Sequence, residues 1–129
     1  MGKSESSKEK TARFDGELYD RRLKVYLAAH ELLSQVSRDG RVSGPSLHAF
    51  EEEKLKGEFL FSEKVSSYLD ELQSLAGKNL ASNTVLEHMG EDEEEQKAKF
   101  TKDADKSLEW LVKQREKLKS TVAKDMAGN

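Results

Sequence analysis

Residues 14–38 have the sequence FDGELYDRRLKVYLAAHELLSQVSR, in which apolar side chains recur every three or four positions. In a helix of about 3.6 residues per turn, this spacing gathers them on one face. The residues of that face are Phe14, Leu18, Arg22, Val25, Tyr26, Ala29, Leu32, Leu33 and Val36. The residues of the opposite face are Asp20, Lys24, Glu31, Gln35 and Arg38. The stretch therefore predicts a long amphipathic helix.

The apolar face of this helix is unusually wide. Tyr19, Leu23 and His30 extend it to nearly half of the circumference. A face of that width needs more than one neighbouring helix to cover it. Arg22 lies within the apolar face, so we expect its guanidinium to reach solvent or to pair with an acid.

A second, short helix follows a clear turn. Asp39-Gly40 ends the first helix, and Gly40 suits the left-handed backbone conformation that commonly follows a last turn. Ser43 is a favourable N-cap. The sequence predicts a helix over residues 44–55. Its inward side chains are expected to be Leu47, Phe50 and Leu55.

The third helix follows the densest apolar cluster of the chain, Phe59-Leu60-Phe61. We expect these three side chains to fill the junction between the short helix and the long ones. Ser62 is the predicted N-cap, and helical spacing continues to about His88. The expected inward residues are Val65, Tyr68, Leu69, Leu72, Leu75, Ala76, Leu80 and Leu86. Three residues weaken the later turns and make a bend plausible: Gly77, Asn79 and Asn83.

The fourth helix is predicted from the acidic run at residues 91–95 to about Lys124. Acidic residues at a helix N-terminus complement the helix dipole. The apolar positions then alternate steps of four and three, which is the heptad spacing of a coiled coil. The residues of this seam are Ala104, Leu108, Leu111, Arg115, Leu118 and Val122.

Together these segments predict an all-α protein, an antiparallel helical bundle of three long helices and one short helix with coiled-coil-like packing. Residues 13–125 form its single domain, and residues 126–129 form a C-terminal tail. Residues 1–12 are a polar flexible tail with almost no apolar side chain. That segment is either frayed or a helical extension that a partner orders.

The composition excludes several classes of protein. The chain has 129 residues, of which 36% are charged and 35% hydrophobic, and it contains no cysteine. Disulfides and thiolate metal sites are thereby excluded. The formal net charge is -3 with both signs mixed, which does not favour direct nucleic-acid binding. No apolar run is long enough for a transmembrane segment, so we expect a cytoplasmic protein.

The residues that carry most enzyme and metal chemistry form no recognisable motif. His30, His48 and His88 lack the spacing of a helical metal site. The glycines form neither a dinucleotide-binding fingerprint nor a phosphate-binding loop, and no Gly-x-Ser-x-Gly element is present. We therefore predict no catalytic, cofactor-binding or metal-ligating residue, no cofactor, and no enzymatic activity.

The candidate partner-binding residues are those that the predicted core does not need. Trp110 lies off the seam of the fourth helix, so it either packs on a second neighbour or contacts a partner protein. Leu27 lies outside the main apolar face of the first helix. The acidic run would steer a basic partner electrostatically. Its residues are Glu91, Asp92, Glu93, Glu94 and Glu95. The wide first face and the heptad seam also predict a homo-oligomer.

Three blocks of the sequence are similar to a widespread set of small, uncharacterised bacterial helical proteins. The first block is residues 20–26 with residues 38–43, and the second is Glu58-Phe59-Leu60-Phe61 with Tyr68-Leu69-Asp70-Glu71-Leu72. The third is residues 108–111, and the resemblance covers roughly residues 18–120. Many relatives carry an N-terminal transmembrane helix, where this chain has its polar tail. The resemblance implies a helical fold and a bacterial or phage origin, and it implies no activity.

These features predict a non-catalytic protein–protein interaction or scaffold module. The alternative is an inhibitor, encoded by a phage or mobile element, that blocks a host enzyme or defence complex through the acidic run. Both hypotheses require a protein partner, and a gene neighbourhood in a prophage or defence locus would favour the inhibitor.

Overall fold

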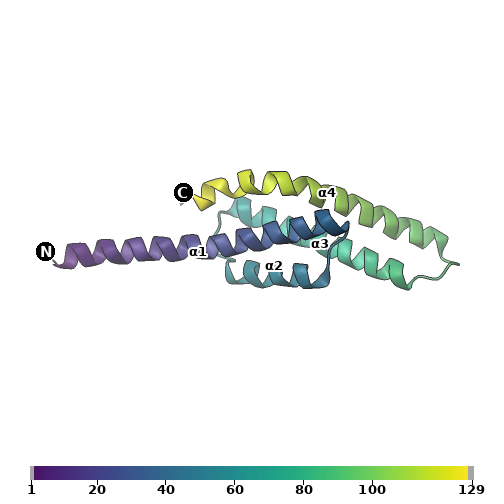
Figure 1. Ribbon diagram of the computed structural model, residues 1–129, viewed down its shortest axis with the longest axis horizontal. Helices are drawn as coiled ribbons and strands as arrows, with labels where there is room; N and C mark the ends of the chain where they lie inside the picture. Colours follow the sequence, from purple (N-terminus) through teal and green to yellow (C-terminus); the bar gives the residue numbers. More distant parts are fainter. Residues whose placement is uncertain (1, 128–129) are drawn as a thin grey trace.

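The computed structural model describes the backbone of residues 2–127 and the side chains of residues 16–127 (Figure 1). It contains four helices, α1 (Gly2–Asp39), α2 (Gly44–Lys56), α3 (Glu63–His88) and α4 (Glu94–Met126). The described residues form no strand. The predicted all-α helical bundle is therefore confirmed.

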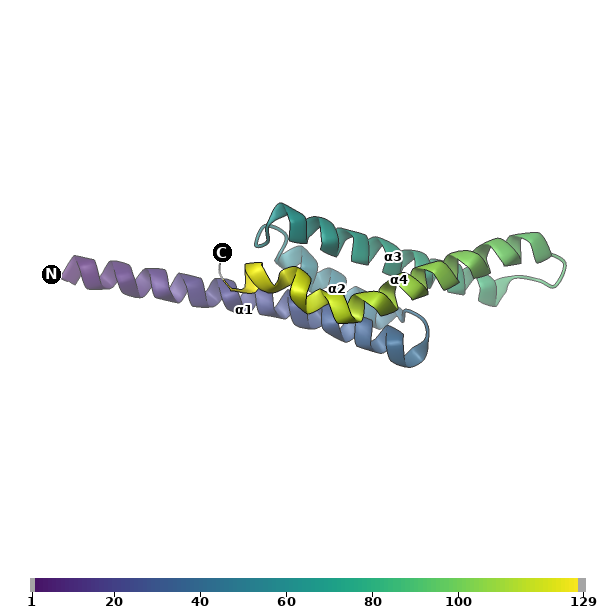
Figure 2. The same cartoon turned by 90° about the horizontal axis from the view of Figure 1, so that it is seen from above.

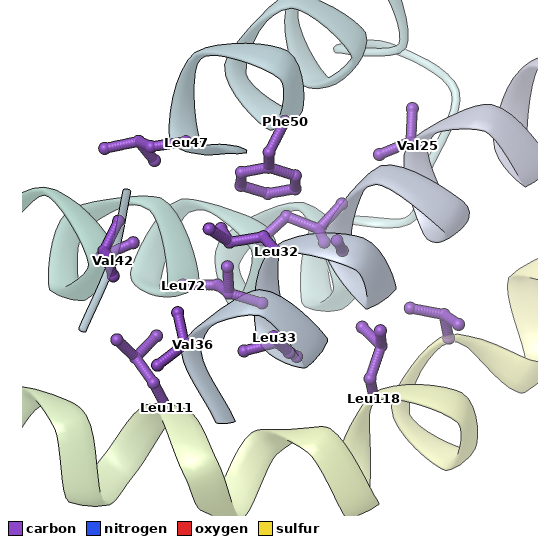
Figure 3. Close-up of a cluster of buried hydrophobic side chains, with 14 of the residues drawn as sticks. Val25, Leu32, Leu33, Val36, Val42, Leu47, Phe50, Leu72, Leu111 and Leu118 are labelled. Atoms are coloured by element: carbon purple, nitrogen blue, oxygen red, sulfur yellow. The ribbon is translucent and has the colours of Figure 1, made fainter. Parts of the chain in front are cut away.

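The four helices form a ring around a narrow core. α1 packs against α2 and α4, and α3 packs against the same two helices, so α1 and α3 lie at opposite corners. The core draws side chains from every helix (Figure 3). Its largest fully buried apolar members are Phe50, Leu32, Leu33, Leu72, Leu111, Val25, Val36, Val42 and Val122. Most are aliphatic residues of medium size, which fits a thin core between long helices.

Each end of the molecule carries an overhang (Figures 1 and 2). At one end, the N-terminal turns of α1 run past the other three helices. At the other end, the α3–α4 hairpin extends beyond the α1–α2 loop. Residues 2–12, where the sequence predicted a polar tail, form the first turns of α1. The ordering of this segment by a partner stays a prediction.

The local start and stop signals act as predicted. Gly40 has φ of 75°, the left-handed conformation expected after α1. The Ser43 hydroxyl accepts from the Ser46 N–H at 3.2 Å, and the Ser62 hydroxyl accepts from the Val65 N–H at 3.4 Å. These caps depend on neighbours in sequence, which explains why sequence analysis located them.

Three apolar residues that we expected to be covered are exposed: Leu55, Phe59 and Tyr19, which is 47% exposed on the wide face of α1. Leu55 is 71% exposed and Phe59 is 93% exposed. Leu55 points away from the core because it lies about 140° around α2 from Phe50, which is buried. Phe59 is displaced because the Leu60 N–H bonds to the Gly57 carbonyl at 3.1 Å, and so tight a turn cannot direct successive side chains inward. Leu60 and Phe61 are half-buried as expected.

The buried face of α4 also differs from the predicted seam. Ser107 and Gln114 are buried, whereas Leu108 is only half-buried and Arg115 is exposed. The buried face of α4 is thus rotated from the predicted seam toward polar residues. Ser107 accepts a hydrogen bond from Asn79 Nδ2 at 3.2 Å, and Gln114 Oε1 accepts one from the Tyr68 hydroxyl at 2.9 Å. Polar partners on α3 therefore select which α4 residues point inward.

Asn79 connects three parts of the bundle rather than simply weakening α3. Its side-chain oxygen accepts from the Val42 N–H at 2.8 Å. Its side-chain nitrogen donates to the Ala104 carbonyl at 3.0 Å. These bonds tie the α1–α2 loop to α4 through the interior of the hairpin and satisfy a buried amide.

Gln35 is likewise buried, although its position on α1 predicted a solvent-facing residue. Its side-chain nitrogen donates to the Arg41 carbonyl at 2.8 Å, and its oxygen accepts from the Ser43 N–H at 3.0 Å. The α1–α2 loop folds over Gln35, so the residue binds main-chain groups that no helical periodicity reveals.

Arg22 is half-buried and binds main-chain groups rather than a described carboxylate. Its guanidinium donates to two main-chain carbonyls, those of Leu60 and Asp125, each at 2.7 Å. The Asp125 carboxylate in turn accepts from the Ser62 N–H at 2.7 Å and from the Ser62 hydroxyl at 3.1 Å. These contacts join α1, the α2–α3 turn and the end of α4.

Candidate functional site

The most prominent exposed apolar feature among the described side chains is the turn between α2 and α3. Phe59 projects from it into solvent, and Leu55, in the last turn of α2, is also exposed. Beside Phe59 lies a recess of about 210 Å³. Its lining residues are Lys54, Gly57, Glu58, Phe59, Phe61, Ser66, Leu69 and Asp70. We call Leu55, Phe59 and this recess the turn surface.

A cationic recess lies on the other side of the same turn, between α1 and α2. It has a volume of about 370 Å³ and is lined by Arg21, Lys24, Glu53, Lys56 and Gly57. Lys56 Nζ lies 3.7 Å from a Glu53 carboxylate oxygen. The recess therefore carries three cations and one anion next to the turn surface.

Trp110 is partly buried and contacts a neighbouring helix. Its ring lies against that of Tyr68 on α3, with centroids 6.4 Å apart and planes tilted by 42°. It is partly buried against the core. Contact between Trp110 and a partner stays a prediction.

The remaining candidate residues are exposed but dispersed. Leu27 is 52% exposed on α1. Glu91 and Asp92 lie in the α3–α4 loop, and α4 begins at Glu94 rather than at Glu91. All five acidic residues of the run are exposed at the tip of the hairpin. The predicted helix start was therefore three residues too early. The N-cap is Glu93, and its side chain makes no capping hydrogen bond, so no local capping signal marked the true start.

The structure separates Trp110 from the acidic run. Trp110 lies sixteen positions after Glu94 on one helix, about 24 Å along its axis. A shallow, open depression of about 820 Å³ runs between them along the outer face of α4, from Glu91 to Glu109. Lysines and carboxylates both line it, so charge of one sign does not gather there.

Tyr68 and Asp39 have pKa values that differ from their ordinary ones; Tyr68 packs against the core, and Asp39 ends α1. Burial, together with the smaller effect of the Glu71 charge, raises the pKa of Tyr68 to about 12. The hydrogen bond from Gln35 lowers the pKa of the Asp39 carboxylate, at the end of α1. Among the side chains of residues 16–127, no three His, Asp or Glu lie close enough together to hold a metal ion.

Sequence reasoning missed the turn surface. Leu55 could have been placed outside, since it lies about 140° from Phe50 around α2. Phe59 offered no such signal, because its direction follows from the shape of a turn rather than from a periodic element.

Comparison of the chain with protein-family models, with curated protein sequences and with solved structures found no match. Of the four helices described, none has an apolar stretch that would allow it to span a membrane.

Proposed function

We propose that the protein is a non-catalytic protein–protein interaction or scaffold module of bacterial or phage origin, and that it holds its partner at the turn surface. The observation that supports this function is the 93% exposure of Phe59. Aromatic anchors dominate binding energy at protein interfaces. Phe59 is an exposed aromatic side chain beside an open recess, so it has the form of such an anchor.

The neighbours of Phe59 strengthen the proposal. Leu55 adds a second large exposed apolar side chain on the preceding helix. The Lys54 ammonium lies 2.6 Å from the Asp70 carboxylate at the edge of the recess. An apolar centre with a charged rim is the usual arrangement of a protein interface.

The acidic run supports the alternative function, an inhibitor that covers a basic surface of a host enzyme or defence complex. All five carboxylates are exposed at the far end of the α3–α4 hairpin, where a partner can reach them. This alternative predicts that partner capture depends on the acidic run and not on Phe59.

Affinity purification from the source organism tests the proposal. The bait proteins are the full chain and its Phe59→Ser variant. We expect the variant to lose the partner by about 30-fold, equivalent to about 2 kcal/mol, because hot-spot truncations cost that much. Its melting temperature should stay unchanged, since Phe59 contributes little to folding.

Val112→Ser is the matched control, because Val112 is also an exposed apolar residue but lies on α4. The control should retain the partner. Equal recovery of the partner by the Phe59→Ser protein and the wild type would contradict the proposal. Loss of the partner only on neutralising the acidic run would favour the inhibitor.

A further inference from the structure

The two ends of the molecule carry opposite charge. Residues 84–103, which we call the acidic tip, hold seven carboxylates and three lysines, a net charge of −4. The opposite end comprises residues 16–24, 53–67 and 119–127, which hold eight basic and six acidic side chains, a net charge of +2. We call it the basic end. The protein is therefore an elongated dipole, although its overall charge is only -3.

The basic end contains the turn surface and the cationic recess. Asp125 of α4 bonds to Ser62, and Arg22 of α1 bonds to Leu60, so these segments meet at one end of the bundle. Beyond them α1 continues alone (Figure 2). The overhanging helix and the end of the bundle form a corner, with Phe59 in its turn and Arg21, Lys24 and Lys56 in its recess.

The acidic tip complements this corner in both charge and surface. The hairpin projects beyond the α1–α2 loop, so α1 and α2 leave its end uncovered (Figure 1). Val85 is 37% exposed there, and Leu86, Met89 and Phe100 are only half-buried. The tip thus offers apolar contacts for Phe59 next to carboxylates for the cationic recess.

We propose that the turn surface docks the acidic tip of a second copy of this chain, head to tail. This inference rests on the proposed function and names its partner. Opposite ends attract each other while like ends repel, so the charge distribution favours the head-to-tail contact over a symmetric one. In this contact each copy uses one end for one neighbour and the other end for the next. When successive copies are related by translation, the assembly does not close, so it grows as an open chain.

Sedimentation velocity of the full chain tests this arrangement. At about 0.05 M salt we expect species larger than 14.6 kDa whose size grows with concentration. At about 0.5 M salt the apparent association should weaken by about tenfold or more, because salt screens exposed charges. Phe59→Ser should weaken association at both salt concentrations.

Complementary charge reversal gives the specific test. One variant carries Glu91→Lys, Asp92→Lys and Glu93→Lys, which all precede α4 and leave its helical residues unchanged. The other carries Arg21→Glu, Lys24→Glu and Lys56→Glu. We expect each variant alone to be monomeric and the mixture to associate again, because each reversed end then faces a partner of opposite sign. A control with Glu31→Lys, Glu71→Lys and Glu109→Lys changes the net charge equally but away from the tip, and should associate as the wild type does.

The possible outcomes distinguish this inference from the proposed function. Re-association of the mixed variants supports the head-to-tail contact. A wild-type chain that stays monomeric at low salt overturns it, and Phe59-dependent capture of a different protein would then leave the proposed function intact. A salt-insensitive dimer that Phe59→Ser abolishes also overturns it, because the turn surfaces would then pair symmetrically. If Phe59→Ser changes neither association nor capture, both proposals fail.

Discussion

The phenol of Tyr68 shows how one half-buried polar group can make stability depend on pH. Its hydroxyl donates to Gln114 across the α3–α4 interface, and burial raises the pKa of Tyr68 to about 12. In the unfolded chain the same group titrates near its ordinary value of 10.0. The folded state therefore holds this proton more tightly than the unfolded state does.

The consequence is a loss of stability at alkaline pH. The contribution is complete below about pH 10 and declines as pH rises from about 10 toward 12, where only the unfolded state has released the proton. We expect Tyr68→Phe to make the free energy of unfolding less dependent on pH in this window. Urea unfolding at several alkaline pH values measures it. Tyr19→Phe is the control, since Tyr19 is exposed, and an identical pH dependence in the wild type and Tyr68→Phe would contradict the assignment.

The end of α2 depends on close approach to α1. A Cβ atom added at Gly57 would lie 2.6 Å from Val25 Cγ2, a methyl group of a core side chain that is 1% exposed. Val25 cannot move away without disturbing that core. The absence of a side chain at Gly57 therefore sets the distance between these two helices.

The substitution Gly57→Ala should destabilise the protein by about 1–3 kcal/mol, the usual effect of overpacking. Gly77→Ala is the comparison variant, for which we expect an effect of the opposite sign. Gly77 lies within α3 with open space where its Cβ would be, so alanine should stabilise by about 0.5–1 kcal/mol. Thermal unfolding followed by circular dichroism measures both. Equal melting temperatures for the two variants would refute the close approach.

At the scale of the whole molecule, the basic end is held together by Arg22. It satisfies two main-chain carbonyls that belong to segments 38 and 103 positions away in the chain. Next to it, Asp125 accepts from the N–H of Ser62, the N-cap of α3. Because three segments meet there, loss of Arg22 affects more than the helix to which it belongs.

We expect Arg22→Met to lower the free energy of unfolding by about 2–3 kcal/mol, since it leaves two partly buried carbonyls without their donor. Arg21→Met, at the neighbouring exposed position, should change it by less than about 0.5 kcal/mol. Urea denaturation of both variants gives the comparison. Similar small effects in the two would mean that water replaces the guanidinium without cost.

Local chemistry accounts for what was predictable about this protein. Helical periodicity predicted the class of fold. The left-handed Gly40 and the N-caps Ser43 and Ser62 located α2, α3 and the end of α1 within a residue or two. Each signal arises between residues a few positions apart, and neighbours in sequence suffice to satisfy it. The start of α4 was less certain because a run of five acids has no single capping residue.

Only tertiary structure determined which side chains face inward at the helix ends and which polar groups the core accepts. Gln35 is buried because a loop folds over it, and Gln114 because Tyr68 lies opposite. Phe59 is exposed because its turn is too tight to direct three successive apolar residues inward. The opposite charges of the two ends were likewise hidden in the sequence, since segments far apart in the chain meet only when the bundle forms. These properties depend on which atoms lie across a helix interface. The periodicity of residues along one helix does not reveal those atoms.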